Sequence, residues 1–570
     1  MHQFYRIAAV SPAAAPGDLA GNLKSLKACY LEAARKGTAI VVFPGFATTG
    51  DDCGSMMRRR DFLARCRETT GEFASSTQET IAVFGTVDEV NGKAVPVTAV
   101  ARRGALLAQI PADTVAEFAV HDDFTFAVAS GEKIPCDVDA DLLLLCGAEA
   151  FAAGARAARE TQLTGFSASA HQAIAFANAG SGISTTDHVG DADAMIAVDG
   201  KILKRATPFA ENEMIFADVD FGRIGFRREK AAKNMELVKL DGVPESPTLE
   251  YAALSRDPFL DEAGKDLPLI VPGAACALAR RIRQIRARSL VLGVSGGLDS
   301  TLALIVCAYA CDILQIPREN VRALTLPGFG TTGRTNANAK KLCRELGVSL
   351  DEIDISEACR LHLAAIGHDG KTTDAAYENS QARERTQILM DYANLTGGIV
   401  IGTGDLSELA LGWCTYNGDQ MSMYSVNATL PKTLMRHILA AEAEKASPAL
   451  AEAIRDVLDT PVSPELLPQK NDDGNSSQQT ESILGPYELH DFFLYHYISS
   501  GANEKKLLFL AQNAFKGVFD ESTVRHTLEN FLRRLFSQQF KRNPAPDGPQ
   551  LTSVSLSPRG GWHIPSDFVK

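Results

Sequence analysis

The residues best suited to chemistry lie in the stretch 295-SGGLDS-300, which follows an apolar strand and precedes an apolar helix. Gly296 and Gly297 allow backbone amides to turn toward an anion, the two serines add hydroxyl donors, and the start of the helix favours negative charge. Asp299 adds a carboxylate, which tolerates a bound anion only if a cation bridges the two. The glycines are adjacent and no lysine follows, so the GxxxxGK[ST] loop of kinases and GTPases is not matched. The stretch therefore predicts a phosphate site with a divalent cation, although a glycine-rich turn that caps a buried helix has the same pattern.

The elements around this loop follow two α/β patterns. Residues 1–225 alternate apolar strands with alanine-rich helices, and a second pattern begins at residue 274 and continues to residue 570. Between them, 226–273 is a charged, proline-containing connecting segment, and 463–482 is a polar loop. In the first pattern we expect strands at 4–10, 39–43, 81–87, 96–101, 125–129, 141–146, 173–178 and 194–198, with helices at 17–37 and 149–170. In the second we expect a helix at 274–288 that leads into a strand at 289–294.

Composition excludes several classes of protein. The 570 residues are 45% hydrophobic and carry a net charge of −13, which fits a globular protein and argues against a general nucleic-acid or anionic-membrane binder. The sequence shows no secretory signal and no run of about 18 apolar residues, so we expect a cytoplasmic protein without a membrane span. The 11 cysteines form no CxxC pair, which indicates reduced thiols used as small apolar residues.

The SGGLDS loop resembles the pyrophosphate loop of ATP pyrophosphatases, which cleave ATP between its α and β phosphates. Three later stretches, at 325–342, 377–438 and 537–549, are similar to the synthetase half of glutamine-dependent NAD synthetases. This resemblance spans residues 255–570. It implies a Rossmann-like doubly wound parallel sheet and the amidation of deamido-NAD to NAD through an adenylate, with release of AMP and pyrophosphate.

The resemblance also implies roles for individual residues, with Asp299 and Lys432 as the catalytic pair. Asp299 and Glu408 correspond to ligands of Mg²⁺, which prefers oxygen ligands of this kind. The positions that correspond to ATP contacts are Gly293, Ser295, Gly296, Gly297, Leu298, Asp299, Ser300, Thr403 and Lys432. The positions that correspond to deamido-NAD contacts are Asn379, Arg383, Glu408, Trp413, Cys414, Thr415, Tyr416 and Lys541. Three of these have a plainer interpretation, since Trp413 could pack in the core, Arg383 could decorate a helix surface and Lys541 could be solvated.

Residues 1–225 resemble the nitrilase-like glutaminase domain of the same family, an α-β-β-α sandwich. The resemblance rests on 39-AIVVFPGFATTGD-51, 109-QIPADTVAEF-118 and the stretch 176–209. That glutaminase uses a glutamate base, a lysine that supports the oxyanion and a cysteine nucleophile. At the matching positions this chain has Gly45, Leu107 or its neighbour Ala108, and Ser130.

All three glutaminase side chains are therefore expected to be absent. Cys136 and Cys146 lie near the third position, and we interpret both as packing residues. We predict a catalytically inactive first domain and an enzyme that uses ammonia, either free or from a separate ammonia-supplying protein. The alternative is a glutamine-dependent enzyme with a non-standard glutaminase site.

Two further classes stay open at this point. One is a different ATP pyrophosphatase, such as a GMP synthetase or an RNA-thiolating enzyme, although the acidic charge and the lack of paired cysteines argue against thiolation. The other is a non-catalytic sensor that binds nucleotides through an intact loop. Because the family's synthetase halves pair, we expect a homo-oligomer, a dimer or higher.

Overall fold

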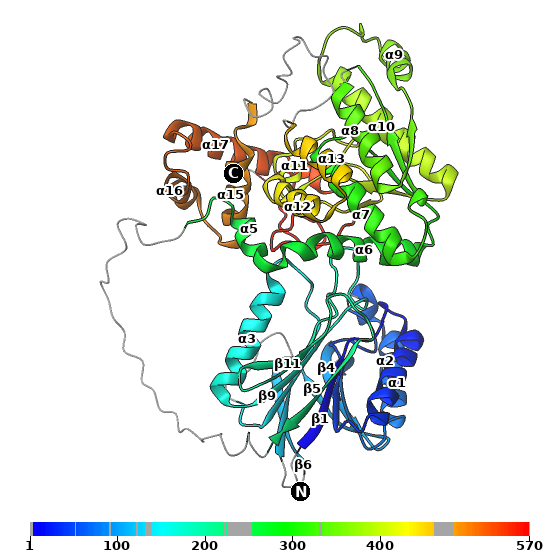
Figure 1. The fold of residues 1–570 in the computed structure, drawn as a ribbon, viewed down its shortest axis with the longest axis vertical. Coiled ribbons are helices and arrows are strands. Elements are labelled where there is room, and N and C mark those ends of the chain that lie inside the picture. Colours follow the sequence, from blue (N-terminus) through cyan, green and yellow to red (C-terminus); the bar gives the residue numbers. More distant parts are fainter. Residues whose placement is uncertain are drawn as a thin grey trace, which may run out of the picture. The chain divides into compact units, whose positions relative to one another are not determined.

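The computed structural model describes residues 4–51, 53–90, 93–120, 124–130, 138–221, 224, 254–329, 333–460 and 483–568. The chain divides into two compact units (Figure 1). The first unit comprises Met1–Phe151, Ala155–Ser184 and His188–Ser246, and the second comprises Ala152–Gly154, Thr185–Asp187 and Pro247–Lys570. The expected polar loop 463–482 and residues 226–253 of the expected connecting segment lie outside the described residues.

The first unit contains two six-stranded sheets. One has the order β12-β1-β2-β3-β4-β5, formed by Met214–Asp220, Phe4–Val10, Ile40–Val42, Ile81–Val90, Lys93–Arg102 and Ala105–Pro111. The other has the order β11-β10-β9-β8-β7-β6, formed by Lys201–Arg205, Ala194–Val198, Ala173–Asn178, Leu142–Gly147, Phe124–Ser130 and Thr114–Val120. The central strands are apolar on both faces, as expected for strands covered on both sides.

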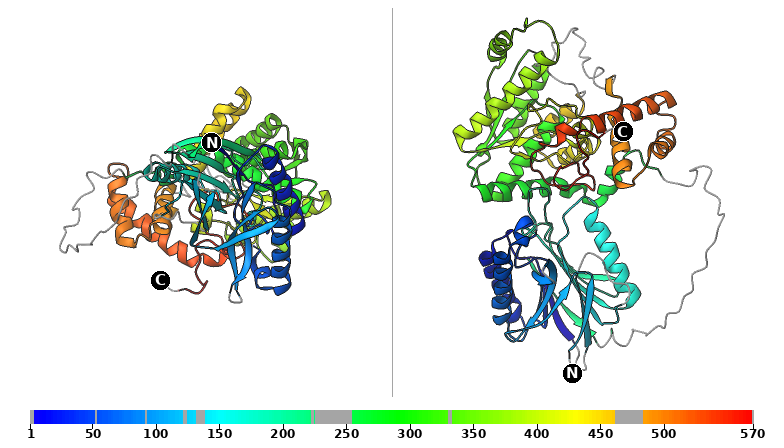
Figure 2. Two further views of the ribbon diagram at one scale, coloured as in Figure 1. Left: turned by 90° about the horizontal axis from the view of Figure 1, so that it is seen from below. Right: turned by 180° about the vertical axis from the view of Figure 1, so that it is seen from behind.

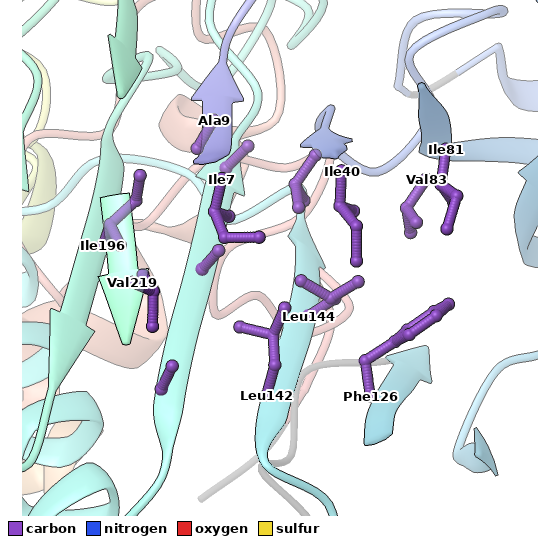
Figure 3. Close-up of a cluster of buried hydrophobic side chains, with 14 of the residues drawn as sticks. Ile7, Ala9, Ile40, Ile81, Val83, Phe126, Leu142, Leu144, Ile196 and Val219 are labelled. Atoms are coloured by element: carbon purple, nitrogen blue, oxygen red, sulfur yellow. The ribbon is translucent and has the colours of Figure 1, made fainter. Parts of the chain in front are cut away.

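Alternation along the strands explains how the layers of this unit pack. Ile7 faces a core that side chains from both sheets share, including Leu142 and Leu144 (Figure 3). Its neighbour Ala8 faces the opposite way, toward α1 (Leu19–Arg35) and α2 (Arg60–Ser75). On the outer face of the second sheet lies α3 (Ala155–Ala170), whose Leu163 packs against that sheet. Figures 1 and 2 show α1 and α2 on one side of the sheets and α3 on the other. The expected α-β-β-α sandwich is confirmed.

The second unit is built on a five-stranded parallel sheet with the order β15-β14-β13-β16-β17. Its strands are Ser349–Glu352, Val321–Thr325, Leu290–Gly293, Ile399–Gly402 and Tyr424–Ser425. The chain first winds outward from β13 to β15 and then returns to place β16 on the other side of β13. Ligands in such sheets bind at the carboxyl ends of the strands where the winding reverses. The expected doubly wound sheet is confirmed, and the stretch 295–300 leaves β13 at this reversal.

Helices surround this sheet and extend beyond it. Those before and around the sheet are α5 (Pro258–Ala263), α6 (Ile270–Ile285), α7 (Leu298–Leu314), α8 (Gly333–Leu346), α9 (Ser356–Ala365) and α10 (Ala375–Thr396). Those that follow are α11 (Leu406–Leu411), α12 (Lys432–Lys445), α13 (Pro448–Leu458), α15 (Tyr487–Ser499), α16 (Glu504–Ala514), α17 (Glu521–Ser537) and α18 (Gln539–Arg542). Short 3-10 turns occur at Gly54–Arg58, Gly264–Leu269 and Arg318–Asn320. Within the described ranges, no helix combines the length and apolar character needed to cross a membrane.

Candidate functional site

The loop between β13 and α7 has a backbone that requires glycine. Gly296 has φ of +85°, and a Cβ at this position would collide with the backbone oxygen of Thr335. The Ser295 hydroxyl accepts a hydrogen bond from the amide of Gly297 at 3.2 Å and lies 3.3 Å from the Ser300 hydroxyl. Leu298 begins α7, and its side chain is buried. The loop thus presents the first amides and hydroxyls of a helix at the carboxyl end of the sheet, which is a suitable cradle for phosphate.

A cluster of charged side chains lies beside this loop. Asp299, Asp405 and Glu408 place carboxylate oxygens within 4.8 Å of one another. The ammonium group of Lys432 lies 3.0 Å from Asp299, 2.5 Å from Asp405 and 3.0 Å from Glu408. Lys432 is buried, with 3% of its side chain exposed. The structure therefore brings together Asp299, Glu408 and Lys432, three of the positions singled out from the sequence.

Burial and mutual repulsion set the protonation of this cluster. Burial raises the pKa of Asp405 well above its usual value, and the charge of Glu408 adds to this while Lys432 opposes it. Burial likewise raises the pKa of Glu408 to about 7, against the opposing charge of Lys432. Burial disfavours the charged form of Lys432, but the three carboxylates outweigh that effect and raise its pKa. Positive charge at this cluster, which Lys432 supplies in part, favours the ionised form of these carboxylates.

Asp405 and Asn427 belong to this site and were overlooked in the sequence. The Asp405 carboxylate accepts a hydrogen bond from the amide of Glu408 at 2.8 Å and so caps the start of α11. The Asn427 amide donates to the carbonyls of Asp299 and Thr403, at 2.9 and 3.1 Å, and so joins the loop after β13 to the loop after β16. The D-x-x-E spacing of Asp405 and Glu408 is a capping signal that the sequence does carry.

Three clustered carboxylates match the oxygen ligands that Mg²⁺ prefers. Asp299 lies at the start of α7, and Asp405 and Glu408 lie at the start of α11. These helices follow the neighbouring strands β13 and β16, so the three carboxylates adjoin the phosphate cradle. The donor set therefore fits a magnesium ion, with Asp405 as a ligand in addition to the two expected from the sequence.

The positions expected to contact deamido-NAD gather around residues 413–416. The Thr415 hydroxyl donates to Asn379 of α10 at 2.8 Å, and the Arg383 guanidinium donates to the carbonyl of Tyr416 at 3.2 Å. Tyr416 is 44% exposed, which leaves its ring available to a ligand. Cys414 is mostly buried, and burial raises the pKa of its thiol far above the usual value. The segment is therefore fixed to α10, with the side chain of Tyr416 partly exposed.

Trp413 and Lys541, which were also expected to contact deamido-NAD, interact with other groups of the protein. The ring of Trp413 lies 5.1 Å from the guanidinium carbon of Arg534. The ammonium group of Lys541 donates to the carbonyls of Gly412 and Cys414, at 2.8 Å each. The structure thus places Arg534 over the first residue of the 413–416 segment and binds Lys541 to the backbone beside it.

The first unit contains a cavity of about 960 Å³. Gly45 and Ser130 line it, together with Cys146, Glu149 and Arg159. Leu107 lies in the middle of β5, is 53% exposed and is not among the lining residues. The turn after β5 and the start of β6 line the cavity instead, from Ala112 to Val115. The pairing of β4 with β5 shifts register between Val100 and Ala101. The described lining residues include no lysine.

The backbone around Gly45 leaves little space for a side chain. The Gly45 amide donates to the carbonyl of Gly147 at 2.9 Å. A Cβ on Gly45 would lie 3.1 Å from the Cβ of Ala148 and 3.3 Å from the carbonyl oxygen of Cys146. Both distances are tighter than ordinary van der Waals contact. A larger residue at this position would therefore require β8 or its following loop to move.

The Cys146 thiol in this cavity lacks the surroundings that would make it a nucleophile. Burial raises the pKa of the Cys146 thiol to about 12, although a hydrogen bond with Thr98 lowers it in part. Arg159 is buried and pairs with Glu149 at 2.8 Å and with Asp191 and Asp193 at 2.9 Å each. The guanidinium among the described lining residues is thus already paired with carboxylates, whereas nucleophilic cysteines need a lowered pKa.

Comparison with known proteins agrees with this architecture. A family model described as NAD synthase matches residues 273–526. The chain is 32% identical to the glutamine-dependent NAD(+) synthetase of Mycobacterium tuberculosis, over 100% of this chain and 96% of that protein. It is 27% identical to the protein of the same name from Xanthomonas campestris, over 92% of this chain and 90% of that protein.

Solved structures show the same fold at lower sequence identity. The glutamine-dependent NAD(+) synthetase from Cytophaga hutchinsonii has a TM-score of 0.75 and 16% identity, over 99% of this chain and 97% of that chain. The synthetase from Acinetobacter baumannii, solved with ADP, has a TM-score of 0.67 and 19% identity, over 98% of each chain.

The fold is thus that of a nitrilase-like sandwich combined with a Rossmann-like synthetase unit. The chain belongs to the glutamine-dependent NAD synthetase family, whose members are ligases of NAD biosynthesis. As NAD synthetases, they use ATP and deamido-NAD as substrates.

Proposed function

We propose that this chain amidates deamido-NAD at the cluster of Asp299, Asp405, Glu408 and Lys432, with ammonia as its nitrogen source. The observation that carries the proposal is the position of this cluster. It adjoins the 295–300 loop at the carboxyl ends of β13 and β16, where the winding of the sheet reverses. The substrate's pyridine carboxylate attacks the α phosphate of ATP and pyrophosphate leaves. Ammonia then attacks the acyl carbon, AMP leaves, and the nitrogen loses a proton to give the amide.

Different residues of the second unit bind ATP and deamido-NAD in the proposed reaction. Gly293 and the residues from Ser295 to Ser300 hold the pyrophosphate end of ATP, and Thr403 lies on the neighbouring loop. Magnesium, when bound by the three carboxylates, would supply positive charge to the phosphate oxygens as they separate. Lys432 adds a buried positive charge beside them. Asn379, Arg383 and the segment Trp413–Tyr416 orient the pyridine end of deamido-NAD, with Lys541 behind that segment.

A small cavity in the second unit suits the nitrogen nucleophile. Its volume of about 30 Å³ is enough for one water-sized molecule. Asp405, Glu408, Asp419 and Gln420 line it, so it adjoins the proposed magnesium carboxylates. Burial raises the pKa of Asp419, whose carboxylate accepts a hydrogen bond from the amide of Thr415 at 2.7 Å. A carboxylate here could hold ammonium and take its proton before attack.

The first unit supports ammonia rather than glutamine as the source. Gly45 stands where the family's base is expected and has no space for a longer side chain without movement. The described lining of the cavity lacks a lysine, and the Cys146 thiol has a pKa of about 12. At neutral pH almost none of this thiol is the thiolate that attacks an amide. We infer that this unit has lost glutamine hydrolysis and that ammonia arrives free or from another protein.

Glutamine remains the second candidate, and the relatives favour it. Both relatives compared above are named glutamine-dependent synthetases. A non-standard site would use the groups that share the cavity, with Cys146 as nucleophile and Glu149 as base. It would need the substrate to displace Arg159 from Glu149, which it pairs with at 2.8 Å.

The nitrogen source is tested by steady-state NAD formation with either ammonium or glutamine as sole donor. Free ammonia in the glutamine stock is removed enzymatically, and glutamate release is measured in parallel. We expect activity with ammonium and no glutamate release. Glutamine-driven activity that Cys146→Ser abolishes, with ammonium-driven activity unchanged, would instead establish the second candidate. Formation of no NAD with either donor would refute the synthetase proposal itself.

We also propose that the chain forms a homo-oligomer, as the resemblance implies. Light scattering during size-exclusion chromatography measures the mass in solution. A mass near 61.1 kDa, that of one chain, would contradict this proposal.

A further inference from the structure

Helix α11 links the two halves of the proposed reaction site. Asp405 and Glu408 lie at its start, and the segment Trp413–Tyr416 follows its end. The helix has only six residues, so most of its backbone carbonyls have no partner within the helix. A helix this short has little stability of its own. Other parts of the chain must therefore hold it in place.

Three cationic side chains from α17 and α18 bind the carbonyls at the end of α11. Arg542 donates to the carbonyls of Leu409 and Ala410, at 3.1 and 3.2 Å. Arg534 donates to the carbonyl of Leu411 at 2.8 Å. Lys541 donates to the carbonyls of Gly412 and Cys414, at 2.8 Å each. We call Arg534, Lys541 and Arg542 the cation clamp.

Burying the three charged groups of the cation clamp costs free energy, which indicates that their placement at the end of α11 is needed. Arg542 has 0% of its surface exposed, and burial lowers its pKa to about 10. Burial also lowers the pKa of Arg534 and of Lys541. The partial negative charge at the end of a helix offsets part of this cost, and hydrogen bonds from cations are strong and directional. Arg542 is itself oriented by Gln539, which accepts from it at 2.8 Å.

Gly412, which follows α11, allows the chain at this point to lie close to the turn between α17 and α18. Gly412 has φ of +58°, and a Cβ there would collide with the side chain of Gln538. The backbone after α11 therefore packs directly on the turn between α17 and α18. Any displacement of that turn would move Glu408 at one end of α11 and Trp413 at the other.

We propose that the cation clamp positions α11, so that Asp405 and Glu408 meet Asp299 and Lys432 while residues 413–416 meet α10. This inference rests on the proposed function, because it assigns the carboxylates of α11 to the reaction. It makes Arg534 and Arg542 positioning residues that act through α11. It also assigns Lys541 to the backbone of Gly412 and Cys414, where the sequence indicated a contact with deamido-NAD.

The two tryptophans of the chain report on the clamp. Trp413 lies beneath Arg534 at 5.1 Å, and Trp562 lies 6.0 Å from the guanidinium carbon of Arg542. In a Trp562→Phe background, the tryptophan emission of the full chain, excited so that tyrosine does not contribute, comes from Trp413 alone. Because Arg534 contacts this ring directly, the Arg542 variant is the one in which the signal follows the position of α11 without requiring turnover.

The test compares Arg534→Met and Arg542→Lys with Arg533→Met, in the full-length enzyme. Arg533 is the adjacent exposed arginine, and it donates to Asn530 on its own helix. With ammonium as donor, we expect kcat to fall about tenfold or more in the two clamp variants, as expected when positioned hydrogen bonds are lost. The magnesium concentration needed for half-maximal rate should rise, and Trp413 emission should change. Arg533→Met should match the wild type in all three measurements.

A purely structural role gives a different result. In that case Arg534→Met would lower the melting temperature but keep the wild-type kcat and magnesium requirement at 25 °C, and that outcome overturns the proposal. Arg542→Lys keeps the charge and provides a second variant if Arg534→Met does not fold. If the wild type makes no NAD, the proposed function fails, and unchanged Trp413 emission in the clamp variants would separately refute the clamp.

Discussion

Replacing Gly45 with glutamate introduces the side-chain type that the resemblance to the family's glutaminase leads us to expect at this position. The structure predicts that the change will be destabilising and will not restore glutamine hydrolysis. The new Cβ lies 3.1 Å from Ala148 and 3.3 Å from the Cys146 carbonyl, and such overpacking costs about 1–3 kcal/mol. For a unit of this size, each kcal/mol lowers the melting temperature by about 2–4 °C. We therefore expect a decrease of about 2–12 °C, given the range of both estimates.

Gly45→Ala is the matched control, because it adds the same Cβ without a carboxylate. Differential scanning fluorimetry gives both melting temperatures, and a glutamate-release assay gives hydrolysis. The alanine variant should account for most of the thermal decrease, and neither variant should release glutamate. A wild-type melting temperature in Gly45→Ala would show that the loop has space and that the steric argument fails. Glutamate release by Gly45→Glu would show that one substitution explains the loss of the reaction.

Three further predictions concern the second unit. Asp299→Asn should abolish pyrophosphate release in a coupled phosphate assay, and residual turnover near the wild-type rate would contradict its role. Lys432→Met leaves the buried Asp405 and the partly exposed Asp299 and Glu408 without their cation, so unfolding experiments should show a loss of up to about 3–5 kcal/mol; a wild-type melting temperature would argue against this pairing. His490 is buried, and burial lowers its pKa from 6.5 to about 4. The folded state therefore stays neutral while the unfolded state takes up a proton, so His490 contributes stability above pH 6.5 that is lost as the pH falls toward 4, by about 3 kcal/mol in total. Urea denaturation at pH 7 and pH 5 measures this loss, which should diminish in His490→Gln.

Strands that are buried on both faces could be predicted from the sequence. The expected strands at 4–10, 173–178 and 194–198 coincide with β1, β9 and β10. The strands β5 and β11 were missed because most of their side chains are exposed, so they carry no apolar alternation. Helix propensity alone did not reveal α2, although its buried Phe62, Cys66 and Phe73 follow helical spacing.

The residues of the candidate site could be predicted where each belongs to a recognisable sequence motif. Asp299, Glu408 and Lys432 lie in separate motifs, and the structure places their charged groups together. Asp405 was overlooked because the sequence around it is that of a helix cap, which gives no sign of its ion pair with Lys432. The expected position of the missing lysine, Leu107, depends on strand register, which a bulge between β4 and β5 alters. The clamp could not be predicted at all, since Arg542 and Leu409 are 133 positions apart.

The dependence of α11 on α17 and α18 has a consequence for the order of events during synthesis. Chains fold as they emerge, with N-terminal units first, so the sandwich and the parallel sheet can pack early. If the cation clamp positions α11 as proposed, its carboxylates become ordered only after residue 542 has been made, because Arg542 binds the carbonyls of Leu409 and Ala410. A nascent chain interrupted before that residue would then hold the 295–300 loop without an ordered Asp405 and Glu408 beside it. The cluster of Asp299, Asp405, Glu408 and Lys432 would thus form only after nearly all of both units has been synthesised.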